Sequence, residues 1–222
     1  RIPFDVFDVK TIDAYFKLLI HYLDAMHIDF YWLDIEKKGL KKEKFILNHY
    51  HFNDMKRNYK RRPMIVAENT NVAPHRYPVL YTRETQVDWK TLKAIPFFNA
   101  SASNNGVTWW AHDIGGSSGG IEEDELFIRY VQLGTFSPIL KLGSEKGIFY
   151  KRAPWLWDTN TYNITKEFLR LRHRLIPYLY SEAYKYHKEG KPLLEPIYYK
   201  YPEMYDDQLY RNEYYFGSQL FV

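Results

Sequence analysis

Short apolar runs alternate with longer amphipathic stretches along this chain, and that alternation limits its fold more than any other feature. The apolar runs occupy residues 28–34, 63–68, 79–82, 107–113 and 136–142. Helical patterns lie between several of them, at residues 11–25, 89–99 and 123–133. Strands that alternate with helices are typical of a parallel sheet covered by helices. The sequence therefore predicts an α/β fold.

Residues 109–116 read WWAHDIGG and end one of these predicted strands. Aromatic rings stack on the C–H faces of a sugar, Asp113 can accept hydrogen bonds from its hydroxyls, and two glycines let the backbone approach a ligand closely. A core strand closed by a glycine turn would give the same pattern. The residues alone leave both interpretations open, a sugar site and a piece of core.

Acidic side chains end or closely follow four of the predicted strands. They are Asp34, Glu68, Glu84 and Asp113. In eight-stranded β/α barrels the carboxyl ends of the strands converge on one face, which carries the active site. Only about five strands can be counted here, so the sequence predicts either an open sheet or part of a larger barrel.

The last quarter of the chain changes in character. A long helical pattern covers residues 166–189 and is interrupted by Pro177, and the aromatic spacing of residues 175–186 predicts a buried helical face. Strand-like segments follow after Gly190. Because the chain starts at Arg1 and stops on an apolar run at Val222, we expect it to be a segment of a longer polypeptide.

Composition excludes several protein classes. A hydrophobic content of 45% with 26% charged residues is globular rather than disordered, and no apolar run reaches the roughly 20 residues that cross a bilayer. We therefore expect a soluble protein without a membrane partner. The absence of cysteine excludes disulfides and slightly favours a reducing compartment such as the cytoplasm, although an exported protein would also fit. The location stays open.

Two further patterns suggest other functions. Basic residues concentrate between residues 37 and 62, where they could contact nucleic acid, but no nucleic-acid-binding motif accompanies them and a solvated surface explains them better. His49, His51 and Asp54 could suggest a metal site. Their segment reads as a helix, on which positions two apart do not converge, so we expect packing or hydrogen-bonding roles and no metal.

The motifs together resemble glycoside hydrolase family 31, a family of retaining α-glycosidases that includes α-glucosidases and α-xylosidases. The resemblance lies in the blocks IDFYWLDIEKKG, LNHYHFNDMKR, HRYPVLYTRET, FFNASASNNGVTWWAHDIGG and LRLRHRLIPYLYSEAYKYHKEGKPLLEPIYYKYP, which occur in the family's order. It implies that residues 1–190 form about strands four to eight of a (β/α)8 TIM barrel. Residues 191–222 would begin a C-terminal β-sandwich.

The resemblance also implies partners and roles for individual residues. The partners would be an α-linked oligosaccharide or glycoside, the remainder of the barrel and an N-terminal β-domain, with no cofactor and no nucleic acid. Asp34 falls on the family's nucleophile and Glu84 on its general acid/base. Substrate contacts are implied for Trp32, Trp110, Asp113 and Arg83.

Several positions depart from the family's pattern. Related sequences carry Ser-Gly-Asp-Thr where this chain has residues 82–85, so Glu84 replaces an aspartate and Arg83 a glycine. Glu68 and Lys141 stand in place of arginines, and Gly143 in place of a substrate-contacting histidine. Two outcomes follow. In one, Arg83 pairs with Glu68 or Glu84 and the pocket serves another sugar; in the other, the protein is a non-catalytic, carbohydrate-binding descendant.

Overall fold

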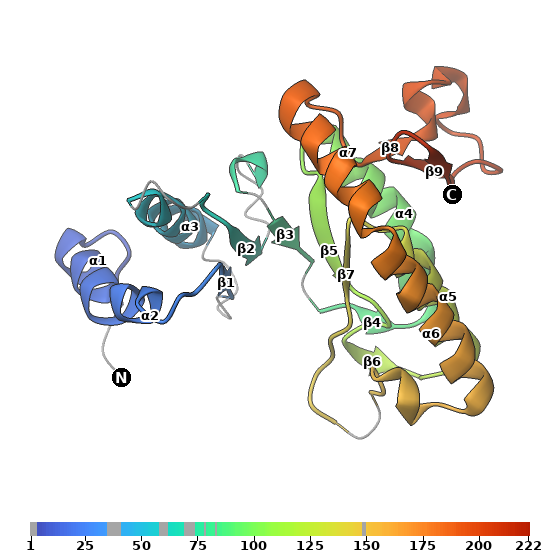
Figure 1. The fold of residues 1–222 in the computed structure, drawn as a ribbon, viewed down its shortest axis with the longest axis horizontal. Helices are drawn as coiled ribbons and strands as arrows, with labels where there is room; N and C mark the ends of the chain where they lie inside the picture. The colour runs from blue at the N-terminus through green and yellow to red at the C-terminus, as the bar shows by residue number, and fades with distance from the viewer. Residues whose placement is uncertain are drawn as a thin grey trace. The chain divides into compact units, whose positions relative to one another are not determined.

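The structure is a computed structural model that describes residues 4–34, 41–57, 62–68, 74–77, 79–82, 84–147 and 150–222. Its residues form two compact units, Arg1–Tyr81 and Thr82–Val222. Each unit combines helices with parallel strands, which confirms the predicted α/β class. The elements of both units are labelled in Figure 1.

The first unit begins with a helix that its sequence defines at the N-terminal end. The Asp8 carboxylate accepts hydrogen bonds from the backbone N–H groups of Lys10 and Thr11, and α1 (Val9–Tyr15) starts there. A π-helical turn (Phe16–Ile20) and α2 (His21–Asp24) continue it, which confirms the predicted helix. The apolar side chains of this segment pack against α3 (Lys41–Lys56). The buried residues of this cluster are Val6, Ile12, Phe16, Ile20 and Leu47.

Three short parallel strands complete the first unit. They are β1 (Tyr31–Leu33), β2 (Ile65–Glu68) and β3 (Val79–Tyr81). Leu33 pairs with Ala67, and Glu68 pairs with Tyr81. Since the strands are parallel and in this register, Asp34, Glu68 and Tyr81 lie at the same end of the unit's sheet. The strands match the first three predicted ones, with shorter bounds.

The second unit holds the remaining predicted strands and most of the helices. Parallel strands β5 (Trp109–Asp113) and β7 (Ile139–Lys141) pair with each other. In Figure 1, α5 runs beside α6, and the Thr135 hydroxyl lies 3.3 Å from the carbonyl oxygen of Phe168 between them. The α-helices among the described residues of this unit are α4 (Trp89–Asn104), α5 (Asp124–Thr135), α6 (Thr159–Arg174) and α7 (Ile176–Glu189).

Two strands of this unit escaped prediction from the sequence. They are β4 (Gln86–Val87) and β6 (Ser118–Gly120), which pair in parallel and join the chain after Glu84 to the chain after Asp113. Both strands are very short, and β6 contains two glycines, so neither shows the apolar alternation by which strands are recognised.

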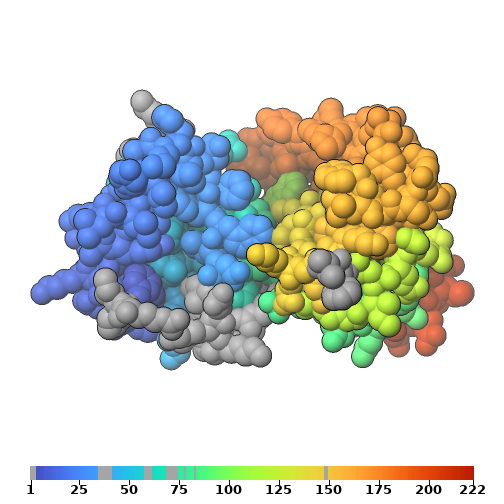
Figure 2. Space-filling view, turned by 90° about the horizontal axis from the view of Figure 1, so that it is seen from below, coloured from blue at the N-terminus to red at the C-terminus, as the bar shows by residue number. Residues whose placement is uncertain are grey.

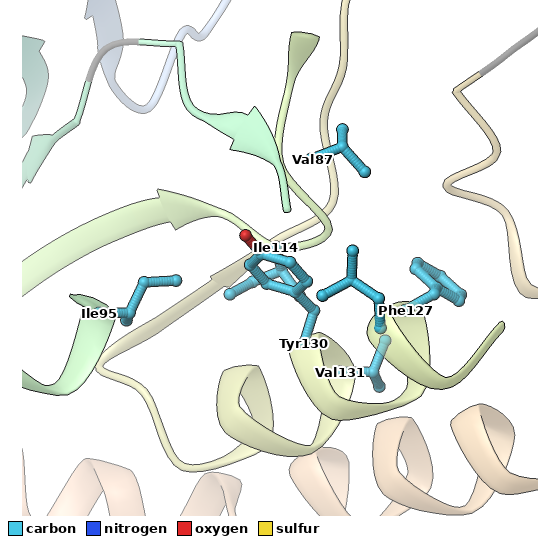
Figure 3. Packing of buried hydrophobic residues seen from close by; sticks show 7 residues of the cluster. Val87, Ile95, Ile114, Phe127, Tyr130 and Val131 are labelled. Atoms are coloured by element: carbon cyan, nitrogen blue, oxygen red, sulfur yellow. The ribbon is translucent and has the colours of Figure 1, made fainter. Parts of the chain in front are cut away.

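A core cluster beneath the end of β5 packs helix side chains against Ile114, which is completely buried. Figure 3 shows Phe127, Tyr130 and Val131 from α5, with Ile95 from α4, around Ile114. Gly134 of α5 also touches this residue, because a Cβ added at Gly134 would lie 3.0 Å from Ile114 Cγ1. The cluster consists of Val87, Ile95, Ile114, Leu126, Phe127, Tyr130 and Val131.

The C-terminal segment forms an antiparallel sheet of β8 (Leu194–Pro196), β9 (Tyr214–Phe216) and β10 (Leu220–Phe221). The strand-like patterns predicted after Gly190 are confirmed in part, because Ile197–Tyr199 and Pro202–Met204 form 3-10 helices. The sheet packs its buried residues, Leu193, Leu194, Tyr214 and Phe216, against side chains that include Tyr178 and Leu179 of α7. The domain boundary between residues 190 and 191 stays a prediction.

The helical pattern of residues 166–189 is divided where proline predicted a break. Helix α6 ends at Arg174, and Pro177 lies in the first turn of α7, where its missing N–H costs nothing. The prediction of a buried aromatic face on α7 was wrong in part, since Tyr180 is 78% and Tyr184 59% exposed. Figure 2 shows the segment of α6 and α7, amber to orange, at the visible surface.

None of the helices within the described ranges combines the length and the apolar character that a membrane span requires.

Candidate functional site

Asp34 follows directly after β1 and is exposed to solvent. Trp32, which is 46% exposed, places its ring edge-to-face with Tyr81 at a centroid distance of 5.2 Å. Burial first, and then the neighbouring Asp34 carboxylate, raises the pKa of Tyr81 to about 12, so this phenol keeps its proton at neutral pH. The first unit therefore presents an open carboxylate beside two aromatic rings. Sequence reasoning named Asp34 and Trp32 but missed Tyr81.

Glu68, at the end of β2, forms an ion pair with Lys44 of α3. Their side chains are only 12% and 7% exposed, so each charge depends on the other for stabilisation. Lys44 belongs to the basic stretch that suggested nucleic-acid binding, and its burial removes one of those cations from the surface. The sequence also suggested that Arg83 pairs with Glu68 or Glu84. Arg83 lies outside the described residues, so this pairing stays a prediction.

Asp113, at the end of β5, forms an ion pair with Lys141 of β7. The strand register dictates this contact, because Asp113 and Lys141 are paired positions in parallel strands. The side chain of Asp113 is 9% exposed and that of Lys141 is 25% exposed. Gly143 lies beside the pair, since a Cβ added there would be 3.2 Å from Lys141 Cε and 3.4 Å from Asp113 Oδ1. A side chain at position 143 would therefore press on this ion pair.

Glu84 is exposed and precedes β4 by one residue, Thr85. The pairing of β4 with β6 brings the chain after Glu84 to the chain after Asp113. The second unit therefore holds the two predicted site carboxylates on connected backbone segments. One of them, Glu84, is open to solvent, and the other, Asp113, is neutralised by Lys141.

Trp110 and Asp113 lie on opposite faces of β5, because side chains alternate along a strand. Trp110 shares its face with His112, and their rings are 6.0 Å apart. His112 is 1% exposed, and its Nε2 lies 2.7 Å from Asn99 Oδ1 on α4. Burial lowers the pKa of His112 to about 3, so the ring is neutral. The structure does not bring Trp110, itself 9% exposed, together with Asp113.

The histidines that suggested a metal site lie on α3 and have separate partners. His51 is 1% exposed, and its Nε2 lies 2.9 Å from the hydroxyl oxygen of Tyr15. His49 pairs instead with Asn53, one turn further along the helix. The predicted packing and hydrogen-bonding roles are confirmed for these two residues. Across the described residues no group of three or more histidines, aspartates or glutamates could hold a metal ion.

Comparison with known proteins shows the family to which this chain belongs. The family model for the glycosyl hydrolases family 31 TIM-barrel domain matches residues 2–182. Neutral alpha-glucosidase C from Mus musculus is 30% identical over 164 residues, which are 73% of this chain and 18% of that protein. An alpha-xylosidase from Emericella nidulans is 28% identical over 163 residues, 73% of this chain and 20% of its own length. The chain thus spans about a fifth of these relatives.

Solved structures give the same fold. The Flavobacterium johnsoniae GH31 dextranase, complexed with glucose, superposes with a TM-score of 0.80 at 20% identity and covers 98% of this chain and 30% of its own. The family match, which extends over most of the chain, agrees with the α/β architecture described above. The chain therefore belongs to glycoside hydrolase family 31, whose TIM-barrel domain it matches over residues 2–182.

Proposed function

We propose that the protein containing this chain hydrolyses α-glycosidic bonds by a retaining, double-displacement mechanism. The observation that carries the proposal is Asp34, an exposed carboxylate fixed at the end of a parallel strand beside Trp32 and Tyr81. The names of the relatives, an alpha-glucosidase and an alpha-xylosidase, support this substrate class. Because the chain spans about a fifth of their length, the activity is proposed for the whole protein.

In this mechanism Asp34 is the nucleophile. Its carboxylate attacks the anomeric carbon, the bond to the leaving oxygen breaks, and a covalent glycosyl-enzyme forms. Water then attacks the same carbon and releases Asp34 as a carboxylate, so two inversions give net retention. A nucleophile has to be within reach of the substrate, and the solvent exposure of Asp34 meets this requirement.

Glu84 is the general acid and base. It donates a proton to the leaving oxygen in the first step and removes one from water in the second. Glutamate carries one methylene more than the aspartate that the family resemblance leads one to expect. Retaining glycosidases hold their two carboxyl groups about 5–5.5 Å apart, so a longer acid/base side chain needs a different backbone position from that of an aspartate.

Asp113 and Lys141 bind sugar hydroxyls in this proposal. The ammonium group holds the carboxylate in place and leaves its remaining lone pairs to accept from a ligand, while Lys141, with 25% of its side chain exposed, can donate to a sugar oxygen. Because Gly143 carries no side chain, it leaves this ion pair undisturbed. Trp32 offers a ring face to the sugar. The contacts expected for Trp110 and Arg83 stay predictions.

The experiment follows the hydrolysis of aryl α-glucosides and α-xylosides by the full-length protein, with the anomer of the first product read by NMR. The proposal predicts an α-configured product, loss of turnover in Asp34→Asn, and slow turnover in Glu84→Gln that added azide accelerates through an α-glycosyl azide. A β-configured first product would contradict the retaining mechanism. Full activity of Asp34→Asn would remove the proposed nucleophile.

One observation favours a second candidate, a non-catalytic carbohydrate-binding protein. Two carboxylates at strand ends, Glu68 and Asp113, form ion pairs with lysines of the same chain. Gly143 has no side chain that could contact a sugar. Saturable binding of α-linked oligosaccharides without any turnover, lost in Asp113→Ala, would establish this candidate. Turnover that depends on Asp34 would exclude it.

A further inference from the structure

The backbone next to Glu84 is held by a buried serine from another loop. The N–H of Thr85 donates a hydrogen bond of 2.7 Å to Ser117 Oγ, and the Ser117 hydroxyl lies 3.2 Å from the carbonyl oxygen of Thr85. The N–H of Ser117 donates to that same carbonyl at 2.7 Å. Ser117 is 4% exposed. A single residue, Ser117, therefore bonds both the backbone N–H and the backbone carbonyl of Thr85, which follows Glu84.

Glycine makes this close approach possible. Gly116 has a φ of +74°, and a Cβ added to it would lie 2.7 Å from the carbonyl oxygen of Gln86 and 2.8 Å from Val87 Cα. A side chain at this position would force the two segments apart. Gly116 thus serves backbone contact with β4, in addition to any approach to a ligand.

Arg152 holds the same glycines from the other side and is 8% exposed. Its Nε and Nη2 donate to the carbonyl oxygen of Gly116 at 3.0 and 2.6 Å, and Nη2 also donates to that of Gly115 at 3.0 Å. Its Nη1 donates to Glu122 at 2.5 Å and to the carbonyl oxygen of Lys151 at 2.9 Å. The five donors of a guanidinium are thereby used within the protein, which is the pattern of a structural clamp and not of a ligand contact.

We propose that Ser117 and Arg152 are positioning residues for the general acid: Arg152 fixes the Gly115–Gly116 turn, and Ser117 transmits that position to the peptide after Glu84. The inference rests on the proposed function, in which Glu84 is the acid/base. A displacement of about 1 Å at a catalytic group can cost about 100-fold in rate. Because glutamate replaces the shorter aspartate of the family pattern, its carboxyl depends closely on where this backbone lies.

The test compares two substrates in the full-length protein carrying Ser117→Ala. A leaving group of high pKa needs a proton from the general acid, whereas an activated aryl group departs with little help. We expect kcat/KM to fall about 10- to 100-fold for a disaccharide and less than about 3-fold for the activated aryl glycoside. Ser118→Ala, which removes a half-exposed hydroxyl next to it, is the matched control and should leave both rates unchanged. Equal losses on both substrates, or none, would overturn the inference.

Hydrogen exchange separates this inference from the proposed function. Ser117→Ala should speed amide exchange in the peptide spanning residues 82–88, because Thr85 loses its acceptor. An unchanged exchange rate would overturn the inference that Ser117 holds the backbone at Thr85, even if the protein hydrolyses glycosides. If the wild-type protein lacks turnover, the proposed function fails, and faster exchange in Ser117→Ala still supports the clamp. Arg152→Lys should restore part of the disaccharide kcat/KM that is lost in Arg152→Met, since lysine keeps one charged donor for the glycine carbonyls.

Discussion

Acidification should destabilise this protein at an unusually high pH, because two histidines are buried in the neutral form. Burial lowers the pKa of His112 to about 3 and that of His51 to about 4. Both values lie below the ordinary value of 6.5, so the unfolded chain binds protons that the folded chain does not between pH 6.5 and these pKa values. Stability is therefore complete above pH 6.5 and falls as the pH falls below it.

The size of the effect follows from the number of protons. One proton taken up on unfolding changes the free energy of unfolding by about 1.4 kcal/mol per pH unit, so two histidines give at most about 3 kcal/mol per unit between pH 6 and 5. A loss of that size is a large part of the stability of a typical domain.

Equilibrium denaturation of the full-length protein at pH 7, 6 and 5 measures this slope. His112→Gln keeps an N–H donor for Asn99 and cannot titrate, so it should lower stability at pH 7 but remove about half of the slope. His51→Gln should remove the other half, since the two histidines lie in different units. Stability that stays constant or rises between pH 6.5 and 5 would refute the reasoning, as would a full slope in the double variant.

Three substitutions test the packing around the site by thermal unfolding. Gly134→Ala gains about 1 kcal/mol of helix propensity, but its Cβ presses on Ile114 at a cost of about 1–3 kcal/mol. We therefore expect a net loss of stability, which Ile114→Val should partly reverse. An increase in stability would contradict this. Lys44→Met takes the ammonium group away from the buried Glu68 carboxylate and should lower the free energy of unfolding by about 3–5 kcal/mol. Adding Glu68→Gln should recover most of that loss. A double variant as unstable as Lys44→Met alone would refute the pairing. Arg172→Met removes the donors to three backbone carbonyls at and after the end of α5 and should lower the free energy of unfolding by about 3 kcal/mol. Arg172→Lys should have an intermediate stability. If both variants were as stable as the wild type, this role of Arg172 would be refuted.

The sequence predicted the elements whose pattern is set by burial. Strands such as Trp109–Asp113 are apolar runs because both faces of a parallel sheet are covered, and helices such as Asp124–Thr135 carry an apolar stripe toward that sheet. It missed β4 and β6, whose position depends on hydrogen bonds between distant segments and not on apolar residues. It also misplaced Tyr180 and Tyr184 in a core, because an aromatic helical stripe has the same spacing whether it is covered or exposed.

For the site, the strand-end pattern located Asp34, Glu84 and Asp113 and the family resemblance implied their roles, whereas the residues that contact them came only from the structure. Lys141 reaches Asp113 because strand register makes them neighbours, and neither register nor strand order can be read from one sequence. Ser117 and Arg152 act on backbone groups, which leave no trace in the side-chain pattern. A glycine pair was the one visible signal, and it pointed equally to a ligand and to close backbone packing.

The central claim is that Asp34 is a working nucleophile, and covalent labelling tests it most directly. The full-length protein would be incubated with α-configured, mechanism-based glucosyl, xylosyl and galactosyl inactivators, and the adduct located by intact mass and peptide mapping. We predict one label per chain on Asp34 with at least one probe, and none in Asp34→Asn. A folded protein that takes up no label from any probe, or takes it up at another residue, would contradict the account.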